Sequence, residues 1–357
     1  MLRRVILLLE IGLVVAGLAV AVAAWQQRSA LQQTLALSEE RLVEVPAGAT
    51  PGGMFNRLED EGILHGAFWL RLYWRFNLAQ QPLHSGEYRL SPGMRALDLI
   101  ELWKRGEVVQ YSLTLVEGWN FRQVRAALAR QEKLEQTLEG LSDDEVMARL
   151  GSPGAHPEGR FFPDTYRYVR GMSDLDLLKQ AHARLEEILA AEWQQRSPDL
   201  PYKDPYQALI MASLIEKETG VPEERRQIAG VFIRRLRQGM LLQTDPTVIY
   251  GMGERYNGKL TRADLREPTP YNTYVISGMP PTPIAMVGRE AIHAALHPAP
   301  GKSLYFVARG DGSHEFSDDL EAHNRAVREY QLKRRADYRS SPAPLPAPDT
   351  VTDKDSQ

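Results

Sequence analysis

The chain has 357 residues, enough for two domains or for one large domain with additions. Its 43 lysines and arginines nearly balance its 46 aspartates and glutamates, and the formal charge is −3, so it lacks the strongly basic face that is typical of nucleic-acid-binding proteins. It contains no cysteine, which excludes disulfides and thiolate metal sites.

The N-terminus predicts a membrane anchor. Residues 5–24 form an almost wholly apolar run that is about long enough to span a bilayer as a helix. Arg3 and Arg4 precede it, and Trp25 follows it at the position of an interfacial aromatic. The two arginines predict that the N-terminus is cytoplasmic and the remaining chain outside. A cleaved signal peptide is the alternative, because Ala21-Val-Ala23 resembles a cleavage site, but the apolar run is longer than a usual signal core and favours the retained anchor.

A weak internal repeat follows the anchor. The polar residues 26–40 predict a short helical stalk, and after them a short strand, a glycine-containing turn and an amphipathic helix recur three times. The first two repeats predict a small α+β module over residues 41–110, and the third opens a larger domain over residues 111–337. Residues 338–357, rich in Ser, Pro, Ala and Asp, predict a disordered tail.

The larger domain mixes helices with a few short strands. The helical patterns cover residues 122–138, 142–150, 173–195, 205–219, 222–238, 288–296 and 317–335. The strand patterns cover residues 166–169, 274–276 and 304–307, and Gly310-Asp-Gly312 predicts a hairpin after the last of them. Because the strands do not alternate evenly with the helices, we expect an α+β fold rather than a regular βαβ series.

One helix carries a carboxyl group at the end of an apolar run. Asp204 is a good N-cap, Pro205 suits the first helical position, and Gly220 ends the helix. Residues 208–215 are apolar except for one serine, so this helix is expected to be buried nearly all round. Glu216 follows directly. Burial against an apolar wall raises the pKa of a carboxyl group, which is what a general acid near neutral pH requires.

Further motifs occur along the domain in a fixed order. They are Glu158-Gly-Arg-Phe-Phe-Pro-Asp-Thr-Tyr166, Ser213-Leu-Ile-Glu-Lys-Glu-Thr219, Leu242-Gln-Thr-Asp-Pro-Thr-Val248, Tyr271-Asn-Thr-Tyr274 and Tyr305-Phe-Val-Ala308. Together they resemble those of the endolytic murein transglycosylases, the membrane-anchored MltG/YceG-like proteins of bacteria. The resemblance runs from the anchor to about residue 335 and implies that the first module is LysM-like.

The resemblance implies a lyase that acts on peptidoglycan without a cofactor or a metal ion. Such an enzyme protonates the oxygen between N-acetylmuramic acid and N-acetylglucosamine, and the muramyl C6 hydroxyl then attacks C1 to leave a 1,6-anhydro end. One carboxyl group performs both proton transfers, unlike the two carboxylates of most glycosidases, and the resemblance assigns this role to Glu216. It also implies a periplasmic catalytic domain on the bacterial inner membrane, termination of nascent glycan strands, and association with peptidoglycan synthases.

Glu218 competes with Glu216 for this role. Positions two apart on a helix face different sides, but a helix that is apolar all round does not show by periodicity which side holds the site. We expect Glu216 to be the acid, and we expect Glu218 to be a buried partner in an ion pair, for example with Arg225.

Two polar segments are expected to bind the sugar. Amide, hydroxyl and aromatic groups suit sugar hydroxyls, acetamido groups and ring faces, and the candidates are Gln243, Thr244, Asp245, Tyr271, Asn272 and Tyr274. Each segment also has a structural explanation. Thr244-Asp-Pro246 is a good helix start, and residues 271–274 suit a packed loop.

Two other groups of residues are weaker candidates. The aromatic residues Trp69, Tyr73, Trp74 and Phe76 suit a glycan-binding face, but helical spacing of aromatics is more typical of a core. His293 and His297 have the i, i+4 spacing of some metal sites, but no second Glu-x-x-His unit accompanies them, so no metal is expected.

Two other functions stay open at this point. One is a muramidase-type hydrolase of the same bond, with Asp245 or Asp164 as the second carboxylate. The other is a membrane-anchored scaffold that binds peptidoglycan without cutting it. The apolar wall beside Glu216 favours an enzyme over a scaffold.

Overall fold

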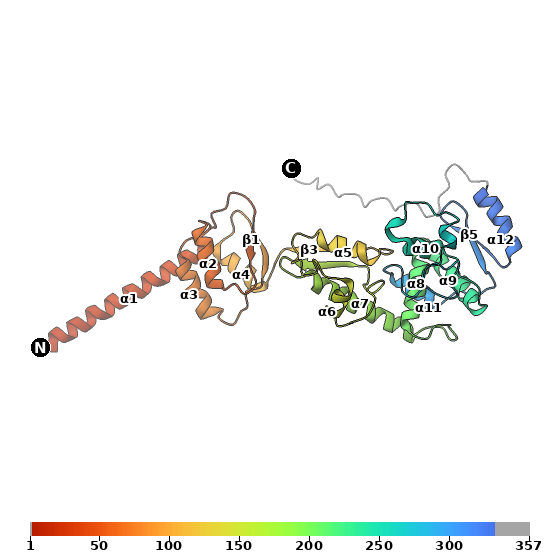
Figure 1. The fold of residues 1–357 in the computed structure, drawn as a ribbon. Coiled ribbons are helices and arrows are strands. Elements are labelled where there is room, and N and C mark those ends of the chain that lie inside the picture. Colours follow the sequence, from red (N-terminus) through yellow and green to blue (C-terminus); the bar gives the residue numbers. More distant parts are fainter. Residues whose placement is uncertain (1, 333–357) are drawn as a thin grey trace. The chain divides into compact units, whose positions relative to one another are not determined.

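The computed structural model describes residues 2–332, which divide into two compact units. Unit 1 holds the chain up to Ser112 together with residues 131–136 and 167–173, and unit 2 holds the remaining residues. The fold is mixed α+β, as expected (Figure 1). The predicted tail, residues 338–357, and the end of the predicted helix 317–335 lie outside the described residues.

The N-terminal helix α1 (Leu2–Gln32) is continuous and exposes its apolar segment (Figure 1). It is long and apolar enough to cross a membrane, which is consistent with a single-pass anchor. The predicted helical stalk over residues 26–40 was too long, because the helix ends at Gln32. Beyond it the Leu35 N–H donates to the Met94 carbonyl at 2.8 Å, so contacts within unit 1 replace helical hydrogen bonds there.

Unit 1 joins a two-stranded sheet to helices. Its elements after α1 are β1 (Arg41–Val45), α2 (Pro51–Asp60), α3 (Ala67–Asn77), β2 (Gly86–Leu90) and α4 (Ala96–Arg105). The strands β1 and β2 are antiparallel, with Val43 opposite Tyr88. The core centres on the aromatic rings of Phe55, Trp74 and Trp103, whose centroids lie 5.1 to 6.3 Å apart, so Trp74 is a core residue.

Unit 2 is built mainly of helices, with short strand pairs. Two strands, β3 (Gln110–Thr114) and β4 (Thr165–Val169), have residues in both units. The other elements of unit 2 are α5 (Phe121–Ala129), α6 (Asp143–Arg149), α7 (Asp174–Gln194), α8 (Pro205–Glu218), α9 (Pro222–Arg237), α10 (Asp245–Met252), α11 (Arg289–Leu296), β5 (Tyr305–Ala308), β6 (His314–Ser317) and α12 (Leu320–Val327). Short 3₁₀ turns occupy Gly253–Arg255 and Asp264–Arg266, and a π-helical turn occupies Arg328–Leu332. The strands β3 and β4 pair, and β5 and β6 form the predicted hairpin.

Helix α8 lies in the core of unit 2, as its apolar sequence predicts. It packs against α7, α9, α10 and α11, and every residue from Ala208 to Ile215 is buried. The polar residue within this buried run, Ser213, donates to the Ile210 carbonyl at 2.7 Å and accepts from the Ile284 N–H at 3.0 Å. This second bond attaches the Gly278–Ile284 segment to α8, so the helix is a rigid support for the groups at its C-terminal end.

One predicted element in this part of the chain was too long, and one was wrong. The helix predicted over residues 122–138 ends at Ala129, because the chain turns at Gln131 and the Glu135 N–H then bonds the Met172 carbonyl. The strand predicted over residues 274–276 is a turn. Asn272 accepts from the Tyr274 N–H through its side chain, at 3.0 Å, and its carbonyl accepts from Val275 and Ile276, so local bonds replace a strand ladder.

Candidate active site

The carboxyl group of Glu216 faces the start of α11. Its Oε2 accepts from the Gly288 N–H at 3.1 Å. The Glu117 carboxylate lies close by, since a Cβ added to Gly288 would lie 1.9 Å from Glu117 Oε1, and glycine is therefore required at this N-cap. Burial and the charge of Glu117 raise the pKa of Glu216 to about 6.

The carboxyl group of Glu218 faces a different part of unit 2. Glu218 is half-buried as a residue, as Glu216 is, and its carboxyl group accepts a hydrogen bond from the Thr244 hydroxyl. Thr244 is buried, and its N–H donates to the Thr273 hydroxyl at 3.0 Å. Burial and the charge of Asp245 raise the pKa of Glu218 to about 7, against the opposing effects of Thr244 and Arg235. Glu218 is therefore a group that exchanges a proton near neutral pH.

Several residues that the sequence predicted as sugar-binding gather near Glu218. The Tyr274 hydroxyl donates to Asp245 Oδ1 at 2.6 Å, and Gln243 and Asp245 are exposed on either side of Thr244. Gln243 has a φ of 51°, in the left-handed region, which a non-glycine residue rarely adopts and which is enriched at functional sites. The structure therefore groups the 243–245 segment with Tyr274 on the Glu218 side of α8.

A buried arginine fixes this segment. The Arg235 guanidinium, on α9, donates to the carbonyl oxygens of Leu241 and Leu242 at 3.1 and 2.9 Å and reaches Gln243 Oε1 at 3.5 Å. Burial lowers its pKa, whereas the charges of Tyr274 and Glu218 favour the cation. Arg235 thus places a positive charge in a dry region close to the Glu218 carboxyl group.

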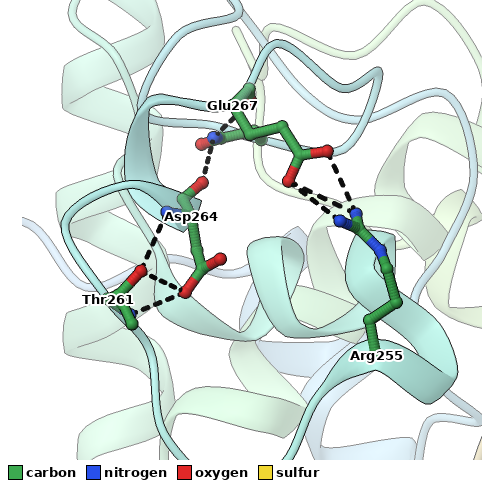
Figure 2. A network of polar contacts seen from close by, with 5 residues as sticks. Arg255, Thr261, Asp264 and Glu267 are labelled. Carbon is green, nitrogen blue, oxygen red and sulfur yellow. Dashed lines mark hydrogen bonds and ion pairs between the residues drawn. The ribbon is translucent and has the colours of Figure 1, made fainter.

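Asn272 and Tyr271 have different roles from each other. Asn272 is fully buried, and its Nδ2 donates to the carbonyl oxygens of Asp264 and Glu267 at 3.1 and 2.8 Å. Figure 2 shows the surrounding loop, in which Thr261 bonds Asp264 and Arg255 pairs with Glu267. The Asn272 amide therefore holds this loop and presents no exposed group to a sugar, whereas Tyr271 lies in the wall of a cleft.

The cleft has a volume of about 880 Å³ and lies wholly within unit 2. Its lining includes the start of α5, one face of α10 and the residues Glu158, Lys217, Pro246 and Tyr271. Lys217 lies between the two candidate carboxyl groups in the sequence, and Pro246 follows Asp245. The cleft therefore reaches the end of α8 at Lys217 and the start of α10 at Pro246, while the residues that line it do not include Glu216 or Glu218. Its size suits a small ligand or part of an oligosaccharide.

Comparison with known proteins identifies the family. The family model described as the YceG-like family matches residues 43–329. The chain belongs to the YceG-like family. The resemblance expected from the sequence motifs is thereby confirmed, and the match covers most of the chain.

The relatives of this YceG-like chain that carry a functional name share the same name. An endolytic murein transglycosylase of Bacillus subtilis is 30% identical over 310 residues, which cover 81% of this chain and 84% of that protein. A protein of the same name from Streptococcus pneumoniae is 27% identical over 81% of this chain, which spans 58% of the pneumococcal protein. The crystal structure of a yceG-like protein from Listeria monocytogenes is 32% identical and has a TM-score of 0.50, with coverage of 80% of this chain and 99% of that one.

The YceG-like motif at residues 158–166 contains a buried acid that the sequence reasoning did not select. Glu158 is 3% exposed, and burial raises its pKa to about 7. The signal that the sequence offered for this acid was a glutamate followed by glycine at the start of a motif rich in aromatic residues. Asp164, at the other end of the motif, accepts from its own neighbour Thr165 N–H at 2.7 Å, which is the structural role of an acid in a turn.

The ion pair predicted between Glu218 and Arg225 is not found within residues 2–332, where Glu218 bonds Thr244 instead.

The two histidines that were candidate metal ligands have a structural partner. His293 and His297 lie with Glu192, and their ligand atoms are all within 4.8 Å. However, Glu192 pairs with Arg289 and His293, each at 3.0 Å, so its charge is already neutralised by a neighbouring cation.

Proposed function

We propose that this protein is a membrane-anchored lyase that cuts peptidoglycan glycan strands within the chain and leaves 1,6-anhydro-muramyl ends. The names of its relatives and its membership of the YceG-like family support the substrate and the reaction class. The site contributes a protonatable carboxyl group on Glu218, whose neighbour in the sequence, Lys217, lines the cleft. The predicted enzyme class, a lyase, follows from these relatives.

The acid in this proposal is Glu218, and the prediction of Glu216 from the sequence becomes the alternative. The single observation that carries the choice is the hydrogen bond from Thr244 to Glu218, which joins Glu218 to the polar segment that the sequence selected for sugar binding. Glu216 instead faces Gly288 and a second carboxylate, Glu117.

The proposed reaction balances without water. The Glu218 carboxyl proton passes to the bridging oxygen as the bond from that oxygen to the muramyl C1 breaks. The oxygen of the muramyl C6 hydroxyl then bonds to C1, and its proton returns to the Glu218 carboxylate. Arg235, held by backbone carbonyl oxygens, stabilises the carboxylate between the two transfers, and Asp245 with Tyr274 offers polar groups to the sugar.

Two features of the cell biology belong to the same proposal. The two N-terminal arginines before α1 favour a cytoplasmic N-terminus and a periplasmic catalytic unit. A site held near the inner membrane suits nascent glycan strands, termination of their growth and contact with peptidoglycan synthases.

Unit 1 suits a LysM-like glycan-binding module. Its contact residue would be Phe76, which is 76% exposed, rather than the core residue Trp74.

A hydrolase is the second candidate, because an acidic residue lies close to Glu218. The charge of Asp245 raises the pKa of Glu218, and most glycosidases use two neighbouring carboxyl groups for catalysis. The two reactions differ in whether water enters the product.

Product analysis tests the proposal. The full-length protein in detergent is incubated with uncrosslinked glycan strands, and the new ends are identified by mass spectrometry. We expect internal cleavage with anhydro-muramyl ends. Reducing ends that are heavier by one water would establish the hydrolase, and tight binding of intact strands with no new ends would establish the scaffold.

A further inference from the structure

Glu158 lies in the wall of the cleft, on a different element from Glu216 and Glu218. Its carboxyl oxygens accept from the Phe121 N–H at 3.1 and 3.2 Å, and its Oε2 also accepts from the Tyr250 hydroxyl at 3.0 Å. Within residues 2–332, no ion pair forms with Glu158. A buried carboxyl group that lacks a cationic partner is costly, so its presence at a cleft requires an explanation.

The position of Glu158 is fixed by its neighbours. Phe121 begins α5 and Tyr250 belongs to α10, so both contacts come from helices. The next residue, Gly159, has a φ of 74°, and a Cβ there would lie 2.5 Å from Pro283 Cβ. Because only glycine allows this approach, the segment that carries Glu158 is held close to the Gly278–Ile284 segment and has little freedom to move.

The surroundings of Glu158 combine polar and apolar groups. The rings of Tyr250 and Tyr271 meet edge to face, with centroids 4.8 Å apart, and both residues line the cleft. An acetamido group has the complementary pattern, with an N–H donor, a carbonyl acceptor and a methyl group. A carboxyl group with an adjacent phenol can serve the two polar atoms, and the aromatic rings can contact the methyl group.

We propose that Glu158 and Tyr250 bind the acetamido group of one sugar residue in the cleft. This inference rests on the proposed function, which makes the cleft a glycan-binding groove, and it adds the chemical group that the groove selects. Burial raises the pKa of Glu158 to about 7, so a neutral carboxyl group is available to donate to the acetamido carbonyl. The structural alternative is that Glu158 only satisfies the first turn of α5.

Binding of two neutral sugars separates these roles. The dissociation constants of the full-length protein in detergent are measured by calorimetry for a tetramer of N-acetylglucosamine and for a tetramer of glucose, which carries hydroxyl groups instead of acetamido groups. We expect the wild type to bind the acetamido tetramer about tenfold or more tightly than the glucose tetramer. The glucose tetramer leaves unpaired the protein groups that bind the acetamido group. Glu158→Leu should reduce this preference to about twofold or less.

Three further variants complete the test. Glu158→Gln keeps one acceptor oxygen for Phe121 and Tyr250 and an amide N–H that can donate to the acetamido carbonyl, so it should retain most of the preference. Tyr250→Phe leaves the contact with Phe121 intact and should lower the preference, which keeps the inference testable if Glu158→Leu does not fold. Glu254→Gln is the matched control, because Glu254 lines the same cleft but its side chain is 83% exposed and pairs with Arg122, and it should leave the preference unchanged.

The outcomes distinguish this inference from the proposed function. Equal binding of both tetramers by the wild type, no binding of either tetramer, or an unchanged preference in Glu158→Leu and Tyr250→Phe would overturn the acetamido site. Formation of anhydro ends is measured in parallel with the wild type. Failure to form them, together with a preference that depends on Glu158, would overturn the proposed reaction and leave the binding site standing.

Discussion

At the scale of single residues, the environment of each carboxyl group sets what it can do. Glu218 exchanges its proton near neutral pH, since burial raises its pKa to about 7. Thr244 orients it, and the buried Arg235 cation favours the carboxylate that remains after proton donation. Glu216 titrates lower, at about 6, and lies beside Glu117.

The pH dependence of the rate should therefore report Glu218. The protonated form is the active acid, so the rate should be highest below pH 7 and should fall about tenfold per pH unit above it. We expect Glu216→Gln to leave this alkaline limb in place. Initial rates of glycan cleavage between pH 5 and 9 measure it, and a limb near pH 6 that disappears in Glu216→Gln would assign the acid to Glu216 instead.

At the scale of elements, three segments bring the site together. The end of α8 supplies Glu218, α9 supplies Arg235, and the start of α10 supplies Asp245 and its N-cap residue Thr244. The contacts of Arg235 with the carbonyl oxygens of Leu241 and Leu242 fix where α10 begins. The residues Pro246, Ile249 and Tyr250 of α10 also line the cleft, so the position of this short helix affects both the surroundings of the proposed acid and the cleft.

A glycine substitution tests the packing of the cleft wall. Gly159→Ala places a methyl group against Pro283, at 2.5 Å, in addition to the strain of a φ of 74°. We expect a loss of about 2 to 4 kcal/mol in the free energy of unfolding. Gly140→Ala is the matched control, because Gly140 has the same φ of 74° and no atom within 4 Å of the added Cβ, and it should lose only about 1 kcal/mol.

Urea denaturation of both variants measures the difference. A loss in Gly159→Ala no larger than the loss in Gly140→Ala would show that the wall yields, and it would weaken the view that Glu158 is held in a fixed position.

Much of this arrangement could be predicted from local sequence. The N-cap Asp204 and the apolar run of residues 208–215, in which Ser213 is the one polar residue, specify α8, and the glycine hairpin specifies β5 and β6. The choice between Glu216 and Glu218 could not be predicted, because a helix that is buried on every side has no periodic pattern to orient it. The turn after Asn272 could not be predicted either. The sequence there is strand-like, but the hydrogen bond to the Asn272 side chain stabilises a turn instead of a strand.

At the scale of the whole molecule, the chain combines an apolar N-terminal helix with two folded units. Distant contacts within the units account for what the sequence did not show. Glu158 lies 37 residues from Phe121 and 92 residues from Tyr250, so no local motif could reveal its partners. The long apolar helix α1, by contrast, is a property of composition alone and could be predicted directly.

The absence of cysteine allows a direct test of the orientation. Glu139→Cys introduces one thiol at an exposed position of unit 2. If the N-terminus is cytoplasmic, a membrane-impermeant maleimide should label this thiol in intact spheroplasts, and the protein should stay in the membrane during an alkaline carbonate wash. Labelling that occurs only after lysis would place unit 2 in the cytoplasm.

The most direct measurement compares two isosteric variants in one assay. The rates at which Glu218→Gln and Glu216→Gln form anhydro-muramyl ends from uncrosslinked glycan are measured against the wild type, with circular dichroism to verify that each variant is folded. We predict a loss of about 10²-fold to 10⁴-fold for Glu218→Gln and a change within about fivefold for Glu216→Gln. A folded Glu218→Gln variant that cuts glycan at the wild-type rate would contradict the account.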